Sequence, residues 1–374
     1  MAHKIKRIVS VLCLAAALCA AALLPVSGYC ENLRFVFIAD SRSDTAPTDP
    51  DHLDEAINTP VLGAIVQQIL NLSPRPSFVV FGGDQAYRGC FTFSGSPYYS
   101  FGAWKQSMQP LATAGIQVYT VVGNHELYVD QEGGFFLSNQ QAFQNAFSST
   151  PYFINPDNGP PNYDHLVYSF ESPGGDAFFA VLDCYYLTQN IPNPDLHGNV
   201  DDIQMGWLVG QLAQTKATHK FLFMHPPYYL ILENQNNQNV TLTNLWSLLD
   251  NNRFDIYFCG HTHLYSRKTI DSSILPNPQP TPPTPPLPPW RNNVVQLLCG
   301  TCGAPVNTGT PTVNPTLWHV YNTANTYYFS VVDITGRKVT VNSYSGNTGA
   351  YTIFESFTIN KIPLGAVDLL LLLD

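Results

Sequence analysis

Five short segments of this chain carry side chains that could bind metal ions, and each segment follows a short apolar run. The apolar runs are Phe35–Ala39, Phe78–Phe81, Val118–Val122, Phe221–Met224 and Ile256–Cys259. The polar side chains that follow them are Asp40, Asp84, Tyr87, Asn124, His225, His261 and His263. Such runs predict buried strands, and strand ends in one sheet are neighbours. We therefore expect these side chains to converge on one site.

This number of carboxylate, imidazole and amide groups is sufficient to bind two metal ions ~3.5–4 Å apart. Such ions lower the pKa of a bound water and neutralise the charge of a phosphate ester. His261 and His263 are separated by one residue, so on an extended chain they point the same way. Gly260 before them permits a sharp turn of the backbone. Taken singly, an aspartate after a strand is usually a cap and a buried histidine is usually a core residue. The ordered set of five segments predicts a two-metal phosphoesterase.

The same segments resemble the calcineurin-like metallophosphoesterase superfamily, and most closely its purple acid phosphatase branch. Gly83–Tyr87 (GDQAY) is similar to the GDxxY motif of that branch, Gly123–Glu126 to GNH(D/E), and Gly260–His263 to GHxH. Met224–Tyr229 (MHPPYY) looks like the segment that carries the isolated histidine. The resemblance runs from about Leu33 to Ile359.

The resemblance implies a metal-binding role for seven residues. Asp84 would bridge both metals. The first site would be completed by Asp40, Tyr87 and His263, and the second by Asn124, His225 and His261. A tyrosinate ligand such as Tyr87 implies Fe(III) in the first site, with Zn, Mn or Fe(II) in the second.

Three further residues are candidates for catalysis. The resemblance implies that a metal-bound hydroxide attacks phosphorus in line, with His125 as general acid over the leaving group. Glu126 would orient His125, or else cap the following helix. Arg42 stands where most superfamily members have a histidine ligand, and where the purple branch usually has glycine. Arg42 cannot bind a metal, so we expect it to contact the substrate phosphate, with an ion pair to Asp44 as the alternative.

The N-terminus has the features of a secretory signal peptide, which we assign to residues 1–28. Lys4, Lys6 and Arg7 precede the apolar stretch Ile8–Leu24, and small residues precede a cut near Tyr29. An uncleaved membrane anchor and lipidation of Cys30 are the alternatives. We therefore expect an exported protein, periplasmic or extracellular, in which residues 33–361 form the catalytic domain and 362–374 a short apolar tail.

Composition narrows the classes of partner. The net charge is −10, 12% of residues are charged and no basic stripe suggests nucleic-acid binding. We expect a small phosphate ester as substrate, and membrane contact only through the N-terminal segment if it is not cleaved.

Six cysteines remain after the signal peptide, which allows disulfides. The Cys299–Cys302 pair could be redox-active or half a zinc site, but a turn is the simpler interpretation, and Cys184 and Cys259 read as core residues.

The alternation of strands and helices predicts an α/β (α+β) four-layer sandwich. Two mixed sheets would pack together, flanked by helices, with the metals at the C-terminal ends of the strands. Expected helices are Thr59–Leu70, Ala103–Leu111, Asp202–Leu212 and Leu242–Leu249. The β-like segments after His263 are expected to be antiparallel strands that complete the second sheet. The proline-rich stretch 275–291 is expected to be a surface loop.

The sequence does not identify the substrate. Aromatic-rich loops at Cys90–Phe101, Leu127–Gly159 and Gln189–Asp201 are expected to form a rim around the site, or else only to pack against each other. A phosphomonoesterase of the acid phosphatase type is the first expectation. The alternatives are a phosphodiesterase acting on nucleotides or phospholipid headgroups, and a non-catalytic surface protein on the same scaffold.

Overall fold

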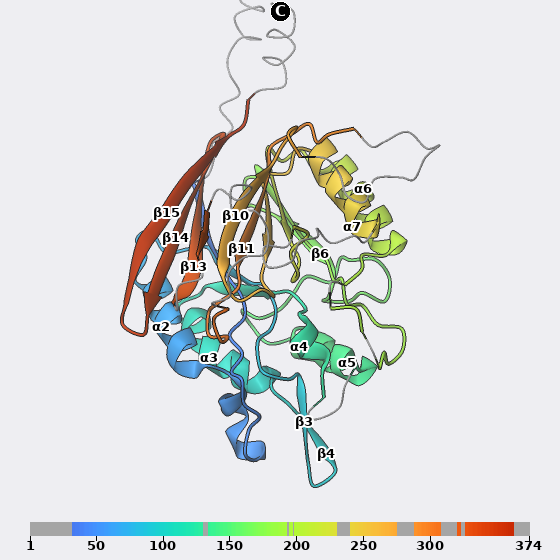
Figure 1. Cartoon of the computed structure of the whole chain (residues 1–374), viewed down its shortest axis with the longest axis vertical. Helices are drawn as coiled ribbons and strands as arrows, with labels where there is room; N and C mark the ends of the chain where they lie inside the picture. Colours follow the sequence, from blue (N-terminus) through green and yellow to red (C-terminus); the bar gives the residue numbers. More distant parts are fainter. Residues whose placement is uncertain are drawn as a thin grey trace, which may run out of the picture.

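The computed structural model describes residues 32–129, 134–192, 194–196, 198–229, 240–274, 288–307, 320–322 and 326–362. The predicted signal peptide, Cys30, most of the proline-rich stretch and nearly all of the C-terminal tail therefore lie outside the described residues. Within them, two mixed sheets pack face to face with helices outside (Figure 1). The predicted fold class is confirmed.

The first sheet has the order β15-β14-β13-β1-β2-β5. Its strands are β1 (Leu33–Ile38), β2 (Phe78–Phe81), β5 (Gln117–Thr120), β13 (Tyr327–Thr335), β14 (Lys338–Asn347) and β15 (Ala350–Asn360). β1, β2 and β5 are parallel, whereas β13 pairs antiparallel with β1.

The second sheet has the order β12-β10-β11-β9-β8-β7-β6. Its strands are β6 (Tyr168–Glu171), β7 (Ala177–Val181), β8 (His219–Phe223), β9 (Ile256–Cys259), β10 (Tyr265–Ile270), β11 (Val294–Cys299) and β12 (Val320–Asn322). β7, β8, β9 and β11 are parallel. A separate hairpin is formed by β3 (Cys90–Phe93) and β4 (Ser96–Tyr99).

The strands after His263 do not all join the second sheet, so that expectation was wrong. β10, β11 and β12 belong to the second sheet, but β13, β14 and β15 extend the first one beside β1. In addition, β11 is parallel to β9 rather than antiparallel. An apolar run predicts that a strand forms. Which earlier strand it pairs with depends on contacts between residues far apart in the sequence, which the run does not show.

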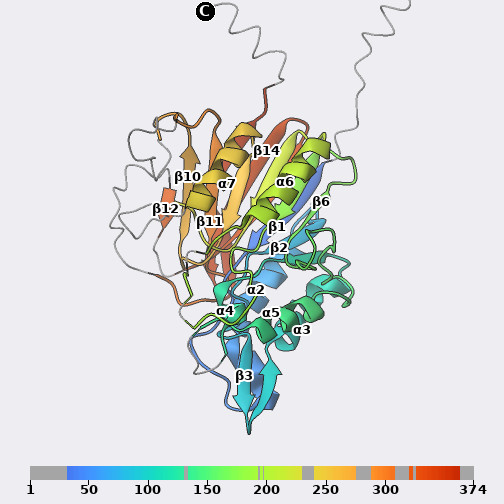
Figure 2. The same cartoon turned by 90° about the vertical axis from the view of Figure 1, so that its right-hand side faces the viewer.

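The helices are a 3₁₀ helix at Pro50–Ala56, α2 (Thr59–Leu70), α3 (Phe101–Thr113), α4 (Asn124–Leu127), α5 (Leu137–Ala146), α6 (Asp202–Gln214) and α7 (Val240–Asn251). Helices α3 and α7 pack on the outer faces of the first and the second sheet, and α4 lies at the strand ends. On the first sheet, the Trp104 ring of α3 lies 4.8 Å from Phe81. On the second, Trp246 of α7 lies 5.8 Å from Tyr257, and Figure 2 shows α6 and α7 across this sheet.

β1 shows why its sequence is apolar without alternation. Phe35 and Phe37 face the second sheet, where Phe35 packs edge-on against Phe221 at 5.4 Å. Val36 and Ile38 point to the other face and join the core beneath the helices. A strand covered on both faces needs apolar residues at every position.

The two ends of the sandwich differ. Parallel strands β1, β2, β8 and β9 all end near the residues with metal-binding side chains. We call the opposite end, where these strands begin and β15 ends at Asn360, the basal end; it is uppermost in Figure 1.

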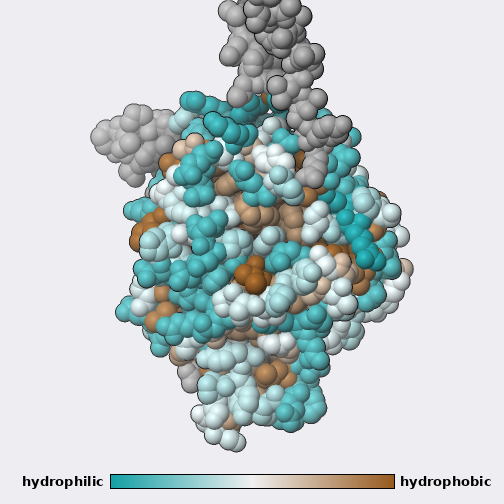
Figure 3. Space-filling view, turned by 180° about the vertical axis from the view of Figure 1, so that it is seen from behind, coloured by the Kyte–Doolittle hydropathy of each residue, from teal (hydrophilic) through white to brown (hydrophobic). Residues whose placement is uncertain are grey.

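Hydrophilic residues cover most of the face in Figure 3, and its hydrophobic patches are small. In the described part of the chain, no helix is long and apolar enough to span a membrane.

Candidate metal centre

Three of the expected ligands lie in strained turns directly after strands. Asp40, Asp84 and His261 have φ angles of 61°, 57° and 69°, in the left-handed region that non-glycine residues rarely adopt. Such conformations persist only where the surroundings enforce them, and they cluster at functional sites. Gly83, with φ of 94°, allows the second turn, because a Cβ there would lie 2.6 Å from His225 Nδ1.

Backbone hydrogen bonds lock these turns together across the two sheets. The Asp40 N–H donates to the Gly83 carbonyl at 3.0 Å. The His261 N–H donates to the Asp40 carboxylate at 3.0 and 3.1 Å. Since β1 and β9 belong to different sheets, the metal-binding edge is built jointly by both sheets.

Asp40, Asp84 and His263 form the first cluster, in which one potential ligand atom of each lies within 4.8 Å of the others. The His263 Nε2 atom is 3.6 Å from Asp40 Oδ1. Its Nδ1 donates to the Pro305 carbonyl at 2.9 Å. A carbonyl can only accept, so the ring presents Nε2 as a lone pair toward the carboxylates. Metal-binding histidines are commonly oriented in this way.

The second cluster is built around His225 and His261. The His225 Nε2 atom is fully buried without a hydrogen-bond partner and lies 3.2 Å from Asp84 Oδ1. Its Nδ1 donates to the Gly82 carbonyl at 2.7 Å. His261 Nδ1 lies 3.0 Å from Asn124 Oδ1. A buried, unpaired nitrogen aimed at a carboxylate fits a metal ion between them, so the residues present suit this group.

Tyr87 is placed near this centre but is not joined to its carboxylates. Its ring centroid lies 6.2 Å from that of His125 and 4.9 Å from the Arg88 guanidinium. Its backbone carbonyl accepts a 2.5 Å hydrogen bond from His125 Nδ1. Its role as a ligand remains a prediction.

His125 lies at the mouth of the centre and is partly exposed. Because its Nδ1 donates to the Tyr87 carbonyl, Nε2 is the atom that faces inward, 3.9 Å from Asp84 Oδ2. Its ring also packs edge-on against Tyr128 at 5.6 Å. Tyr87 and Tyr128 therefore position the His125 ring, and its backbone N–H donates to Asp84 Oδ1 at 3.0 Å.

Glu126 does not contact the His125 side chain. Its buried carboxylate accepts three backbone N–H groups, from Gly123 at 2.6 Å, Asp84 at 2.9 Å and Gln85 at 2.6 Å. The bond to Gly123 caps α4, the alternative that the sequence left open. The other two bonds fix the turn of Asp84. This positioning role was missed, although the Gly123–Glu126 spacing is that of a capping box.

Arg42 points into the centre and not toward Asp44. Its Nε lies 4.0 Å from Asp84 Oδ2 and its Nη1 donates to the Ser43 carbonyl at 3.1 Å. A second arginine, Arg88, was not singled out from the sequence. It lies over the ring of Tyr128 at 4.3 Å as well as over Tyr87, which places its charge beside His125. No signal in the sequence distinguished it.

The two buried carboxylates differ in their electrostatics. Burial raises the pKa of Asp40 well above its ordinary value against the effect of His225, and the charge of Asp84 adds to the rise. Burial would also raise the pKa of Asp84, but His225, His125 and Arg42 hold it well below its usual range. Asp84 is therefore the carboxylate that stays ionised among several cationic neighbours.

The pKa values of the three candidate histidine ligands also differ with their surroundings. Burial lowers the pKa of His261 to about 3 and that of His263 to about 4, so both rings are neutral at pH 7. Burial also acts on His225, but Asp84 outweighs it and raises the pKa of His225 to about 9. A metal ion would compete with the proton for this nitrogen.

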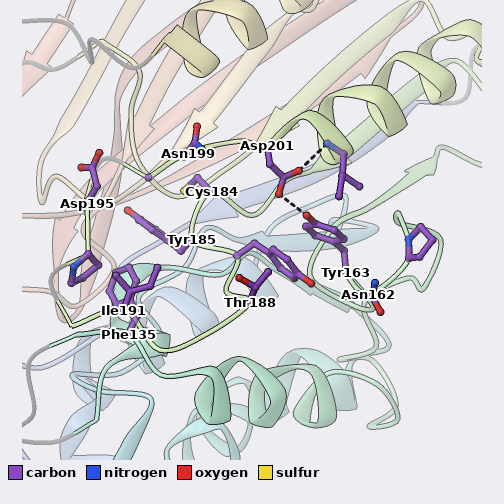
Figure 4. Close-up of a pocket in the computed structure, with 15 residues that line it drawn as sticks. Phe135, Asn162, Tyr163, Cys184, Tyr185, Thr188, Ile191, Asp195, Asn199 and Asp201 are labelled. Atoms are coloured by element: carbon purple, nitrogen blue, oxygen red, sulfur yellow. Dashed lines mark hydrogen bonds between the residues drawn. The ribbon is translucent and has the colours of Figure 1, made fainter.

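A cavity of about 500 Å³ borders the centre (Figure 4). Tyr185, whose ring lies 6.2 Å from that of His225, forms the wall between them. Phe135 and Ile191 line it from two of the predicted rim loops. On the far side, the Tyr163 hydroxyl donates to Asp201 at 2.5 Å.

No described cysteine is part of the metal centre, although Cys184 lines the neighbouring cavity. Cys184, Cys259, Cys299 and Cys302 are buried and carry no disulfide bond. Burial raises the pKa of each of these thiols. Cys184 and Cys259 are core residues, as predicted, and Cys299–Cys302 is a turn after β11.

Comparison with known proteins agrees with this geometry. Over 244 residues the chain is 26% identical to purple acid phosphatase 23 of Arabidopsis thaliana, covering 63% of this chain and 47% of that protein. The chain thus spans about half the length of this curated relative. The purple acid phosphatase PPD1 from yellow lupin (Lupinus luteus) seeds is similar in fold, with a TM-score of 0.57 and 16% identity, covering 90% of this chain and 55% of the other. The structure of PhoD gives a TM-score of 0.56 and 11% identity, covering 88% and 70%.

The chain also matches a protein family over more than half of its length. Residues 33–265 match the calcineurin-like phosphoesterase family. This range contains β1, β2, β5, β8 and β9, and with them all ten candidate site residues. The chain therefore belongs to the calcineurin-like phosphoesterase family.

Proposed function

We propose that this chain is an exported phosphomonoesterase with a centre of two metal ions. The observation that carries the proposal is the convergence of buried carboxylates and imidazoles from both sheets on one edge. Four strand ends supply Asp40, Asp84, His225 and His263, with distances of 3.2 to 3.6 Å between the facing histidine and carboxylate atoms. Export rests on the N-terminal sequence alone.

Asp84 is the residue best placed to bridge two ions. Its Oδ1 faces His225, and a ligand atom of the same carboxylate lies within 4.8 Å of those of Asp40 and His263. The first ion would be held by Asp40, Asp84, His263 and Tyr87, and the second by Asp84, Asn124, His225 and His261. When bound, such ions lower the pKa of a water and neutralise the phosphate oxygens.

The remaining chemistry belongs to side chains at the mouth of the centre. His125 Nε2 faces the site, and burial lowers the pKa of His125 to about 4. The doubly protonated ring, in which Nε2 would deliver a proton to the departing alcohol oxygen, therefore forms mainly at acidic pH. Arg42 is fixed beside Asp84 and would donate to the phosphate oxygens as negative charge develops on them. Glu126 would act only by holding the Asp84 turn.

The identity of the metals depends on Tyr87. Similarity to purple acid phosphatase 23 supports Fe(III) in the first site, with Zn, Mn or Fe(II) in the second. A tyrosinate bound to Fe(III) would give the purified protein a visible absorption band. A colourless active protein containing only manganese or zinc would contradict this assignment.

The cavity beside Tyr185 supports an organic leaving group. It provides about 500 Å³ of space and aromatic walls next to the centre. None of the residues that line it is a candidate site residue and Tyr185 separates it from the centre, so it would hold a part of the substrate remote from the phosphate.

The test compares p-nitrophenyl phosphate with bis(p-nitrophenyl) phosphate as substrates. We expect faster hydrolysis of the monoester, and a loss of 10²–10⁴-fold in kcat on His125→Ala with the metal content retained. His52→Ala, at an exposed histidine, is the matched control and should be fully active. Preferred hydrolysis of the diester would replace the monoesterase proposal by a phosphodiesterase, and no hydrolysis of either by the metal-loaded protein would contradict both.

A further inference from the structure

The basal end is positively charged although the chain as a whole is acidic. Nine of the 14 basic residues after residue 31 lie at this end: Arg34, Arg75, Lys216, Lys220, Arg253, Arg291, Arg337, Lys338 and Lys361. Six described acids lie there too: Glu171, Asp176, Asp250, Asp255, Asp271 and Asp333. The rest of the described chain has five basic and 15 acidic residues. Most of the cations thus lie at the end opposite the metal centre, with Arg42 and Arg88 as exceptions.

Hydrogen bonds link several of these residues across the basal end. The Arg34 Nη1 donates to the Pro74 carbonyl at 2.8 Å, beside Arg75. On the other side, the Lys361 N–H donates to the Arg337 carbonyl at 2.9 Å. His219 Nε2 lies 3.0 Å from the Gly336 carbonyl, which closes the gap between the two sheets.

Most of the cations on this surface are available to a partner. Arg34 is paired with Asp333 at 2.7 Å and Lys361 with Asp255 at 3.2 Å. None of the other seven is paired with a described acid. The exposed residues among them are Arg75, Lys216, Arg291, Arg337 and Lys338.

A cavity of about 410 Å³ opens on this surface. Its cationic lining is Arg253, Arg267, Arg291 and Lys361, and no described Asp or Glu lines it. Arg267 is already bound to Glu355 at 2.6 Å, which leaves Arg253 and Arg291 for an anion. The volume of the cavity is sufficient for a phosphate group.

An exposed apolar side chain lies on the same surface. Ile362 lines the cavity and is 50% exposed. The sequence that follows Ile362 includes the apolar run Leu369–Leu373. A lipid bilayer combines anionic headgroups with an apolar layer, whereas a soluble polyanion offers only charge.

We propose that the basal end docks on a membrane surface rich in anionic lipids, so that the metal centre faces away from the bilayer. The exposed cations contact headgroup phosphates, and one headgroup enters the cavity between Arg253 and Arg291. This goes beyond membrane contact through the N-terminal segment alone, because the folded domain itself supplies the docking surface. It is independent of the proposed phosphatase activity.

The test is co-sedimentation with vesicles, using the chain from Tyr29 onward so that Ile8–Leu24 cannot carry the binding. We expect binding to phosphatidylcholine mixed with phosphatidylglycerol, weakened by salt, and little binding to phosphatidylcholine alone. The triple variant Arg291→Gln, Arg337→Gln, Lys338→Gln should lower the partition coefficient on the order of 100-fold. Its hydrolysis of soluble phosphate esters should match that of the unaltered chain.

The matched control lowers the net charge by the same three units elsewhere. It is Thr92→Glu, Ser96→Glu, Gln106→Glu, at exposed positions in the β3–β4 hairpin and α3. This control should bind anionic vesicles almost as well as the unaltered chain. The proposal is overturned if the two triple variants bind alike, if both vesicle types bind the chain equally, or if heparin binds it while anionic vesicles do not.

Discussion

Single residues at this centre act through atoms that a sequence motif does not describe. The motifs identified Asp40, Asp84, His225 and His263 as a set because each follows a strand, and the structure brings them together. They could not show which nitrogen of each histidine is free. That depends on backbone carbonyls such as those of Gly82 and Pro305, which come from other parts of the chain.

Glu126 gives the first prediction at this scale. Its carboxylate accepts three backbone N–H groups, whereas the amide of Glu126→Gln has only one acceptor oxygen. At least one buried N–H then faces another donor, which costs about 1–3 kcal/mol. We expect a lower urea midpoint and weaker metal binding, because the Asp84 turn is no longer fixed.

The control for this prediction is Glu55→Gln. Glu55 is exposed and accepts one backbone N–H, from Thr48 at 2.8 Å. It should change neither the urea midpoint nor the metal content appreciably. An equal effect of both substitutions would show that Glu126 does not hold the centre.

At the scale of elements, glycines permit the close approach of the strand ends. A Cβ at Gly260 would overlap Asp40 Oδ2 and lie 2.8 Å from the Ala39 Cβ. The two sheets meet at this point, so there is little room for either backbone to shift. The sequence showed Gly260 before the two histidines, but not that Asp40 occupies the space a side chain would need.

Gly260→Ala should therefore damage the centre as well as the fold. We expect a loss of about 1–3 kcal/mol of stability from overpacking, together with reduced metal content per folded chain. Gly206→Ala in α6 is the comparison, since nothing lies within 4 Å of a Cβ there and alanine is favoured in helices by ~1 kcal/mol. The test is to measure the unfolding midpoint and the metal content of both variants. An unchanged metal content in Gly260→Ala would contradict the close-packed centre.

The sequence predicted the existence of elements better than their partners. α2, β2 and β9 have the predicted bounds, since a run of apolar residues with helical or strand periodicity is a local signal. The hairpin β3–β4 and helix α5 were missed because their residues are polar or irregularly spaced. The return of β13 to β1 was missed because pairing over such a sequence separation leaves no local trace.

Across the whole molecule, charge is distributed in a way that the linear sequence concealed. The basal cations are spread from Arg34 to Lys361, so no stretch of sequence looks basic. They meet only because parallel strands begin at one end of the sheets. The acids, by contrast, concentrate toward the metal centre and the cavity beside it.

One buried acid should make the stability of the whole domain depend on pH. Asp183 is fully buried, its Oδ2 lacks a hydrogen-bond partner, and burial raises its pKa to about 7. In the unfolded chain an aspartate titrates near 3.9. The folded state binds the proton of Asp183 more tightly than the unfolded state does. The contribution of this protonation to the stability of the domain is therefore full below pH ~4 and is lost as the pH rises to ~7.

Asp183→Asn removes this titration. Relative to the unaltered chain, the variant should gain stability between pH 5 and pH 8, by on the order of 3 kcal/mol at the upper end. Urea unfolding of both proteins at the two pH values measures the difference. An identical pH dependence in the two proteins would show that Asp183 does not cause it.

The most direct test of the metal centre is the metal content of the purified chain compared with that of Asp84→Asn. Asp84 faces both ligand clusters and is replaced by an amide of nearly the same shape, so the fold should persist. We predict about two metal ions per folded chain, and for Asp84→Asn a loss of bound metal together with phosphate ester hydrolysis. Two ions retained by Asp84→Asn, or full activity in a chain without bound metal, would contradict the account.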